Sequence, residues 1–209
     1  PVRPDWDLER RLWSRGLAAV AGVDEAGRGA LAGPVVAAVV LLPAGREYPY
    51  RDSKSLAPAA RARLAARVRS EALAFACGYA PAAVVDEVNV LEATKRAARA
   101  AVAEVARLVD GLITDYLVLD SGLPEVAVAK ADARSFQVAA ASILAKHTRD
   151  ALLARYEDEY PGYGFGRHFG YGVPQHLDAL RRLGPCAEHR RTFAPVTRLG
   201  ALVNGDAAA

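Results

Sequence analysis

Asp24-Glu25-Ala26-Gly27-Arg28-Gly29 follows directly on the apolar stretch Leu17–Val23. The apolar stretch predicts a buried strand over residues 17–25, so the two carboxylates lie at the end of that strand. Adjacent carboxylates repel each other, and a folded chain holds them in a confined place when a cation lies between them or water screens them. We favour a bound cation here. The glycines let the backbone approach a ligand, and Arg28 supplies a planar fork suited to phosphate.

Further carboxylates are predicted at or just after the ends of other strands, at Asp120 and Asp132. Carboxylates at strand ends can converge on one edge of a sheet from distant points in the sequence. Oxygen ligands of this kind suit Mg²⁺ or Mn²⁺, and two such ions about 4 Å apart can promote an in-line displacement at phosphorus. Taken alone, Asp120 fits a turn before Ser121-Gly122, and Asp132 fits a helix or turn cap equally well. Together with Asp24-Glu25 they favour a metal site and phosphodiester chemistry.

Strands and helices are interspersed along the chain and predict a mixed α/β core around a central sheet. The predicted strands cover residues 17–25, 34–42, 75–80, 116–120 and 126–130, with the first two antiparallel. The predicted helices begin at Pro58, run over residues 90–108 after an N-cap at Asn89, and cover residues 138–156 and 174–183. A break at Pro161-Gly162 divides a catalytic core, residues 1–160, from a C-terminal helical segment, residues 161–209, whose last residues, 205–209, we expect to fray.

Composition excludes several classes of protein. The chain has 209 residues, enough for one substantial core, and no apolar run approaches the length of a membrane span. The N-terminus lacks the pattern of a signal peptide, and the two cysteines are far apart, so we expect a cytoplasmic protein without disulfides. The net charge of +3 does not by itself indicate nucleic acid, but basic residues gather at Arg181-Arg182 and His189-Arg190-Arg191. Such a cluster suits phosphate, although a solvated helix face explains any single pair better.

Short blocks over residues 20 to 198 resemble, in the same order, the signature blocks of ribonuclease HII. They are Gly22–Gly29 with Gly33-Pro34, Asp52-Ser53-Lys54, Leu119–Gly122, Lys130–Asp132, Ala140–Lys146, and Gly164-Phe165 through Gly170-Tyr171. One block would be a weak signal, but this many in one order form a strong one. The resemblance implies a ribonuclease-H-like fold, with a central mixed β-sheet flanked by helices and a small C-terminal helical segment.

The resemblance also implies roles for individual residues. The family's metal-binding acids, which hold two divalent ions, Mn²⁺ or Mg²⁺, are matched by Asp24, Glu25, Asp120 and Asp132. The turn and the tyrosine that read the ribose 2′-hydroxyl are matched by Gly27, Arg28, Gly29 and Tyr171. For Tyr171 the alternative is a packed surface aromatic. Contacts to phosphate are expected from Ser53, Lys54 and Lys146, with Ser142 a weaker candidate.

Two positions depart from the family pattern: Phe169 stands where lysine is common, and Ala131 stands where glycine is common. Losing the lysine removes one possible phosphate contact, and Ala131 requires only that its backbone avoid a positive φ. A zinc site is the other metal site to consider, but the histidines and Cys186 match no tetrahedral spacing. These histidines are His147, His168, His176 and His189.

By resemblance, the expected activity is hydrolysis of the RNA strand of RNA–DNA hybrids and cutting at single ribonucleotides in duplex DNA. The expected products carry 5′-phosphate and 3′-hydroxyl ends, and the expected use is removal of misincorporated ribonucleotides and RNA primers. We expect a monomer that binds such nucleic acids and no membrane. Two alternatives remain: another two-metal nuclease of the same fold, such as a resolvase relative, and a non-catalytic nucleic-acid-binding module.

Overall fold

The computed structural model describes residues 3–51 and 53–205. The predictions for Asp52 and for a frayed end at residues 206–209 lie outside these residues. The chain packs as two compact units. The first contains the residues up to Ala26, Val36–Tyr79 and Thr94–His147, and the second contains Gly27–Val35, Ala80–Ala93 and the residues from Thr148 on. The predicted boundary between residues 160 and 161 stays a prediction.

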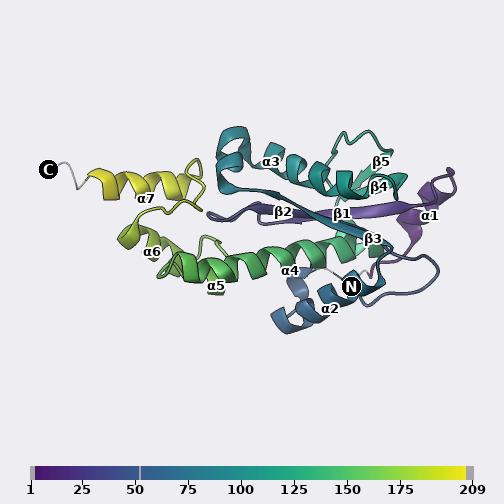
Figure 1. The fold of residues 1–209 in the computed structure, drawn as a ribbon, viewed down its shortest axis with the longest axis horizontal. Helices are drawn as coiled ribbons and strands as arrows, with labels where there is room; N and C mark the ends of the chain where they lie inside the picture. The colour runs from purple at the N-terminus through teal and green to yellow at the C-terminus, as the bar shows by residue number, and fades with distance from the viewer. Residues whose placement is uncertain (1–2, 52, 206–209) are drawn as a thin grey trace. The chain divides into compact units, whose positions relative to one another are not determined.

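A mixed sheet with the strand order β3-β2-β1-β4-β5 dominates the first unit (Figure 1). Strand β1 pairs antiparallel with β2 and parallel with β4, and β4 pairs parallel with β5. The strands are β1 Val20–Ala26, β2 Val35–Leu41, β3 Ala74–Ala80, β4 Gly111–Asp115 and β5 Glu125–Val128. The predicted central mixed sheet and the antiparallel first pair are therefore confirmed.

Helices flank the sheet within the first unit, and others make up most of the second unit. They are α1 Asp7–Trp13, α2 Pro58–Glu71, α3 Ala82–Val105, α4 Phe136–Glu159, α5 Phe165–His168, α6 Pro174–Leu183 and α7 Ala194–Gly205, with short 3₁₀ turns η1 Ser53–Ser55 and η2 Ala131–Ala133. The helix starts predicted at Pro58 and Pro174 are confirmed. Asn89 lies at a kink inside α3, with φ 70°, and its side-chain oxygen accepts hydrogen bonds from the main-chain N–H groups of Leu91 and Glu92. It is the predicted N-cap.

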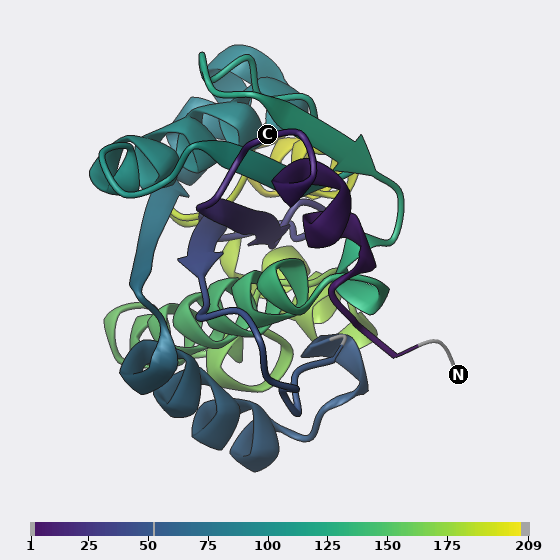
Figure 2. The ribbon, with the colours of Figure 1, turned by 90° about the vertical axis from the view of Figure 1, so that its right-hand side faces the viewer.

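The core of the first unit forms where α4 lies directly on β1. A Cβ at Gly22 would lie 2.2 Å from the main-chain carbon of Gln137, so only glycine permits this approach. The alanines at the start of α4, Ala139 to Ala141, are fully buried, and their small side chains allow the same close packing. Helix α2 lies next to α4 (Figure 2). Its residues Ala65 and Val68 belong to this core.

The fourth strand is not where the sequence pattern places it. We predicted a strand over residues 116–120, but β4 is Gly111–Asp115 and Asp120 does not end a strand. The physical reason is burial: residues 111–114 are buried throughout, as a strand between two parallel neighbours requires. In the next segment Leu117 and Leu119 are buried while Tyr116 and Val118 are exposed. That alternation suits a segment with one face against the core and one in water.

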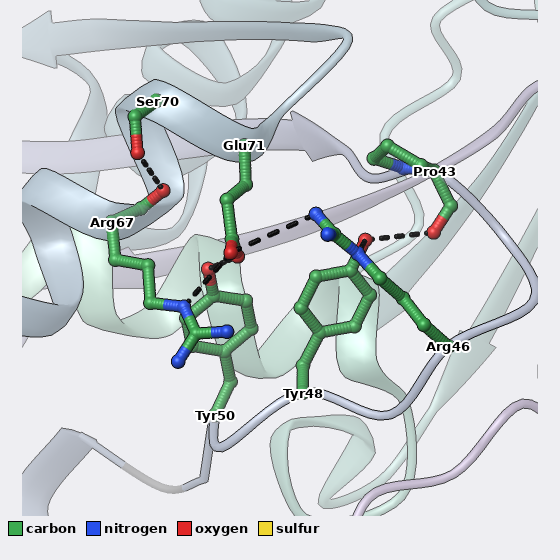
Figure 3. Close-up of polar contacts among 7 residues, drawn as sticks. All are labelled: Pro43, Arg46, Tyr48, Tyr50, Arg67, Ser70 and Glu71. Atoms are coloured by element: carbon green, nitrogen blue, oxygen red, sulfur yellow. Dashed lines mark hydrogen bonds and ion pairs between the residues drawn. The ribbon is translucent and has the colours of Figure 1, made fainter.

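A polar cluster holds the loop after β2 on α2 (Figure 3). The hydroxyl of Tyr50 donates to Glu71 over 2.7 Å, and Nε of Arg67 donates to the same carboxylate over 2.9 Å. Tyr48 stacks on Tyr50 with ring centres 5.2 Å apart, and Nε of Arg46 donates to the Tyr48 hydroxyl. Burial raises the pKa of Glu71, but the hydrogen bonds from Tyr50 and Arg67 lower it more, so the net shift is downward. The loop is thus fixed by a charged acceptor that stays ionised.

Within the described residues, no helix combines the length and the apolar character that crossing a bilayer requires.

Glu9 is a fully buried acid of the first unit. Its Oε1 accepts a hydrogen bond of 2.6 Å from the Ser135 hydroxyl, while Oε2 has no hydrogen-bond partner among the described residues. Burial raises the pKa of Glu9 from 4.5 to about 7. Because the folded-state pKa is raised, the free energy of unfolding is unaffected at low pH and decreases as the pH rises from 4.5 through 7.

We therefore predict that Glu9→Gln stabilises the protein in alkaline solution. The variant should gain about 1–3 kcal/mol in the free energy of unfolding at about pH 8.5, because it no longer buries an ionised carboxylate. The gain should be much smaller at about pH 4.5, where the parent carboxyl is protonated in the fold. Denaturant melts at both pH values measure it, with Asp7→Asn on the exposed face of the same helix as control. An equal effect of Glu9→Gln at both pH values would contradict the prediction.

Candidate functional site

Asp24 is placed by the alternation of β1 and by the start of α4. Side chains alternate along a strand, so Asp24 shares the face of Gly22, which packs on α4. Asp24 is 7% exposed, and its carboxylate accepts hydrogen bonds from the Ser142 hydroxyl and from the main-chain N–H of Glu25. The Ser142 hydroxyl lies 2.9 Å from the hydroxyl of Ser53, which is also buried. A polar chain thus runs from η1 through α4 to the acid.

The electrostatic environment of Asp24 disfavours its charge. Burial, followed by the neighbouring Glu25, raises the pKa of Asp24 well above its usual value. Asp115 adds to this rise, and the hydrogen bonds from Ser142 and the Glu25 N–H oppose it without cancelling it. An acid held in this way either keeps its proton or needs a cation to replace it.

A small cavity lies beside these carboxylates. Its volume is about 10 Å³, which is room for one water molecule or one ion. Asp24, Glu25 and Asp115 line it together with apolar and small side chains, which are those of Val23, Ala37, Ala98, Thr114, Leu117 and Leu119. Acidic residues from two neighbouring strands, β1 and β4, therefore line one small cavity.

Asp115 is the member of this group that sequence reasoning missed. It is the last residue of β4, and its Oδ1 accepts a hydrogen bond of 3.1 Å from the main-chain N–H of Ala131. Ala131 begins η2 and precedes Asp132, so Asp115 ties the cavity to the turn that carries another predicted acid. The missed signal was an aspartate after the apolar run Leu112–Ile113. An aspartate at the end of an apolar run is also the pattern of Asp24. Our prediction of a strand over residues 116–120 concealed it.

Asp120 lies outside the cavity in this structure. Its side chain is 69% exposed and forms long ion pairs with Nζ of Lys95 at 3.8 Å and with Nη2 of Arg99 at 3.9 Å. The preceding residue, Leu119, lines the cavity, so the main chain at Asp120 is adjacent to it. Asp132 is half-buried on η2. Among residues 3–51 and 53–205, no three His, Cys, Asp or Glu side chains stand arranged to hold a metal ion.

The residues of the first unit that we predict to contact phosphate differ in their exposure to solvent. Ser53 is 2% exposed and bonds to Ser142, so its hydroxyl serves the chain to Asp24. Lys54 is exposed on η1, and Lys146 is half-buried on α4. The lysines thus have at least partial access to solvent, whereas the serine does not.

In the second unit, two buried arginines organise the loop that carries Gly27, Arg28 and Gly29. Arg149 is fully buried, and its Nε, Nη2 and Nη1 donate to the main-chain oxygens of Pro34, Ala32 and Phe169, each over 2.9 Å. Arg190, also fully buried, donates from Nε and Nη2 to the oxygen of Gly33 and from Nη1 to the oxygen of Arg28.

These guanidinium groups remain cations. Burial lowers the pKa of Arg149, and burial together with the charge of Arg149 lowers the pKa of Arg190 to about 9. Both stay charged at neutral pH, and every hydrogen bond recorded for them ends on a carbonyl oxygen. The loop therefore carries positive charge in its interior.

The predicted ribose-reading residues come together in this unit through the same arginine. Cζ of Arg149 lies 5.4 Å from the centre of the Tyr171 ring, and Tyr171 is half-buried. The main-chain N–H of Leu31 donates to the oxygen of Gly170 over 2.8 Å, which fixes the loop against the turn before Tyr171. Phe169, the departure from the family pattern, has a positive φ of 51° and accepts the bond from Arg149 through its oxygen. Ala131 has no positive φ, as its side chain requires.

Gly27 and Gly29 differ sharply in the space around them, which gives a matched pair of variants. Gly27 has a φ of +95°, and a Cβ there would lie 2.0 Å from Nε of Arg149, whereas a Cβ at Gly29 would meet nothing within 4 Å. We predict that Gly27→Ala lowers the free energy of unfolding by about 1–3 kcal/mol or more, through backbone strain and a displaced guanidinium. Gly29→Ala should stay within about 0.5 kcal/mol of the parent.

Denaturant melts of the two variants measure this difference. Equal stability of both variants would contradict the inference that Gly27 leaves the space that the Arg149 guanidinium needs. Since no protein atom fills the space at Gly29, loss of cleavage by a stable Gly29→Ala protein would report a contact with substrate.

Comparison with known proteins adds an independent finding. Residues 21–196 match the family described as Ribonuclease HII. A ribonuclease HII of Thermus thermophilus is 55% identical over 191 residues, which are 91% of this chain and 93% of that protein. The crystal structure of ribonuclease H2 from Pyrococcus horikoshii has a TM-score of 0.77 at 25% identity, over 90% of this chain and 99% of that one. Archaeoglobus fulgidus RNase HII, solved in complex with PCNA, has a TM-score of 0.74 at 25% identity, over 86% and 96%.

Proposed function

We propose a specific activity for a chain that belongs to the ribonuclease HII family, a family of hydrolases that act on nucleic acid. The protein hydrolyses the RNA strand of RNA–DNA hybrids and cuts at single ribonucleotides within duplex DNA, leaving 5′-phosphate and 3′-hydroxyl ends. It does so with two divalent ions. In the cell this activity serves the removal of misincorporated ribonucleotides and RNA primers.

The observation that carries the proposal is the crowding of carboxylates around the buried Asp24. The pKa of Asp24 is raised by burial and by its neighbours Glu25 and Asp115, and all three residues line the small cavity. Oxygen donors of this kind suit Mg²⁺ or Mn²⁺, and a divalent ion would relieve the repulsion that the protein bears without it. When bound, such ions activate a water molecule and stabilise the leaving oxygen of an in-line displacement.

The residues that would hold the ions are Asp24, Glu25, Asp120 and Asp132. Asp120 can join them because its present ion pairs are long and exposed, and such pairs contribute only about 0–1 kcal/mol. Asp115 has a different task in this proposal. Its carboxylate accepts the N–H of Ala131 and so holds η2, the turn that carries Asp132.

Recognition of the ribose is assigned to the loop and turn of the second unit. The difference between RNA and DNA in the sugar is the 2′-hydroxyl, so the enzyme must bond it. Gly29 leaves open space for a close approach of the backbone, and the half-buried Tyr171 offers a ring and a hydroxyl. The interior charges of Arg149 and Arg190 favour a phosphate beside them. Gly27 follows Glu25 by two residues in the sequence, so the chain couples recognition to the acids.

A duplex with one embedded ribonucleotide tests the activity as a whole. We expect cleavage of this DNA with Mn²⁺ or Mg²⁺, none in excess chelator, and none of the matched all-DNA duplex. Cleavage of both duplexes would favour the resolvase-like alternative, because that chemistry does not depend on the 2′-hydroxyl. Binding without cleavage under all metal conditions would favour the non-catalytic module.

Three asparagine variants separate the roles of the acids. We predict that Asp24→Asn and Asp120→Asn abolish cleavage while largely sparing hybrid binding, because an amide lacks the ligand charge and binding rests on dispersed phosphate contacts. Asp115→Asn should keep cleavage near the parent rate, because the Asn oxygen can still accept the N–H of Ala131. Single-turnover rates at saturating Mn²⁺ decide the matter. Parent-like turnover of Asp120→Asn with loss in Asp115→Asn would exchange the two roles.

Tyr171 variants separate the ring from its hydroxyl. We predict that Tyr171→Phe slows cleavage at a single embedded ribonucleotide by about ten- to a hundredfold, and weakens binding of the same duplex less, if the lost hydrogen bond tightens in the transition state. Tyr171→Ala should be worse in both respects, because it also removes the stacking surface. Single-turnover rates and melting temperatures of the three proteins provide the test. Parent-like cleavage by both variants would remove Tyr171 from ribose recognition.

A further inference from the structure

Two buried imidazoles of the second unit form a hydrogen-bonded chain that ends at the main chain of Tyr171. His176, in α6, is 0% exposed and His189 is 1% exposed, and their Nε2 atoms are 3.0 Å apart. Nδ1 of His176 lies 2.9 Å from the main-chain oxygen of Tyr171. At the other end, Nδ1 of His189 lies 3.0 Å from the main-chain nitrogen of Cys186 and 3.1 Å from its sulfur.

The partners at the two ends of the chain fix one tautomer for each ring. A main-chain N–H only donates, so Nδ1 of His189 accepts from Cys186 and the proton of His189 sits on Nε2. That proton is donated to Nε2 of His176, whose own proton therefore sits on Nδ1 and is donated to the Tyr171 oxygen. Burial favours these neutral rings, because it lowers the pKa of His176 to about 4 and that of His189 to about 3.

A third imidazole, that of His168, also contacts this turn. The ring of His168 stacks on that of His176, with centres 4.4 Å apart and an angle of 17°. Its Nε2 lies 2.8 Å from the oxygen of Tyr163, and its Nδ1 accepts the N–H of Gly170 over 3.2 Å. The N–H of Val173 also donates to the Tyr171 oxygen over 2.9 Å, so both lone pairs of that oxygen are used.

The turn needs such support because its own backbone is permissive. Gly170 has a φ of +77°, and Gly172 follows Tyr171 directly. Glycines on both sides leave the direction of the Tyr171 side chain weakly determined by local sterics. A fixed carbonyl oxygen supplies the missing restraint, and catalytic contacts depend strongly on such positioning.

We propose that His176 and His189 are positioning residues that fix the main chain of Tyr171, so that its side chain meets the ribose at the cleavage site. The inference rests on the proposed role of Tyr171 in ribose recognition. Neither histidine touches the substrate. Each acts through a single donated proton: Nε2–H at His189 and Nδ1–H at His176.

Asparagine and glutamine distinguish the two protons, because the Asn side-chain nitrogen mimics Nδ1 of histidine and the Gln nitrogen mimics Nε2. At position 176, Asn keeps the donor to Tyr171 and Gln loses it. At position 189, Gln keeps the donor to His176 and Asn loses it. We predict parent-like single-turnover cleavage of an embedded ribonucleotide by His176→Asn and His189→Gln. Cleavage by His176→Gln and His189→Asn should be slower by about tenfold or more.

The crossed order separates positioning from simple packing. A role confined to filling the core would rank Asn and Gln by size, in the same order at both positions, and cleavage would fall in step with the melting temperature. That result would overturn the proposal. Melting temperatures of all four variants are measured alongside the rates, so that a folding defect shared by Asn and Gln at one position is recognised as packing.

Combination with Tyr171→Ala separates this inference from the function on which it rests. If His176 acts through Tyr171, His176→Gln should slow the parent enzyme but have no further effect on cleavage by Tyr171→Ala, although its melting temperature still falls. Slow cleavage by Tyr171→Ala with parent-like cleavage by His176→Gln would overturn the inference alone. Parent-like cleavage by Tyr171→Ala would overturn the proposed ribose reading, and with it the inference.

Discussion

The second unit depends on the hydrogen bonds that the guanidinium group of Arg149 donates. It donates to carbonyl oxygens on both sides of Gly33, at Ala32 and Pro34, and to the oxygen of Phe169, so one buried group fixes a loop and a turn far apart in sequence. A buried charge is tolerated only when its hydrogen-bonding groups find partners, and three carbonyls provide them here. Glycine is needed at position 27, because any side chain there would occupy the position of the Arg149 guanidinium.

The first unit meets the opposite problem, because it concentrates negative charge. Asp24 is buried beside Glu25 and Asp115, and hydrogen bonds from Ser142 and the Glu25 N–H ease its ionisation without restoring its usual pKa. Such an arrangement lowers stability unless a proton or a cation is present. In the proposed metal site, a carboxylate that is already desolvated, as that of Asp24 is, binds a divalent ion without first losing its water. Glu9 is a second buried acid of this unit whose pKa burial raises.

Local signals in the sequence predicted the elements that local chemistry determines. Pro58 and Pro174 start α2 and α6, and Asn89 caps the second part of α3, because each of these residues acts on its nearest backbone groups. The strand over residues 116–120 was wrong because two adjacent segments have nearly equal apolar character. Only pairing with β1 and β5, which no local pattern records, decides that residues 111–115 form the strand between them. The position of Asp115 beside Asp24 follows from that pairing and was missed with it.

The hydrogen-bond partners of buried polar groups could not be predicted from the sequence, for a related reason. Arg149 donates to Pro34 and Ala32, which precede it in the sequence by 115 and 117 positions. Arg190 donates to Gly33, which precedes it by 157 positions. In the sequence both look like ordinary surface arginines, and Arg190 was assigned to a basic cluster. The His176–His189 contact spans only 13 positions, yet its meaning depends on burial and on which ring nitrogen carries the proton. The spacing of these histidines in the sequence matches no zinc site, and it does not reveal this contact.

The carbonyl partners of the two arginines bear on the phosphate binding proposed for a chain with a net charge of only +3. A carboxylate partner would have neutralised each guanidinium, and the field outside the loop would have been that of a dipole. Carbonyl oxygens satisfy the N–H groups and leave the formal charge in place. In the proposed function, the charges of Arg149 and Arg190 favour an anion near the Gly27–Val35 loop, while Asp150 and Asp86, whose charges act on these two groups, weaken that field. A lysine at position 169 would have added a surface charge to this proposed site, and salt screens a surface lysine more than it screens the buried guanidinium groups.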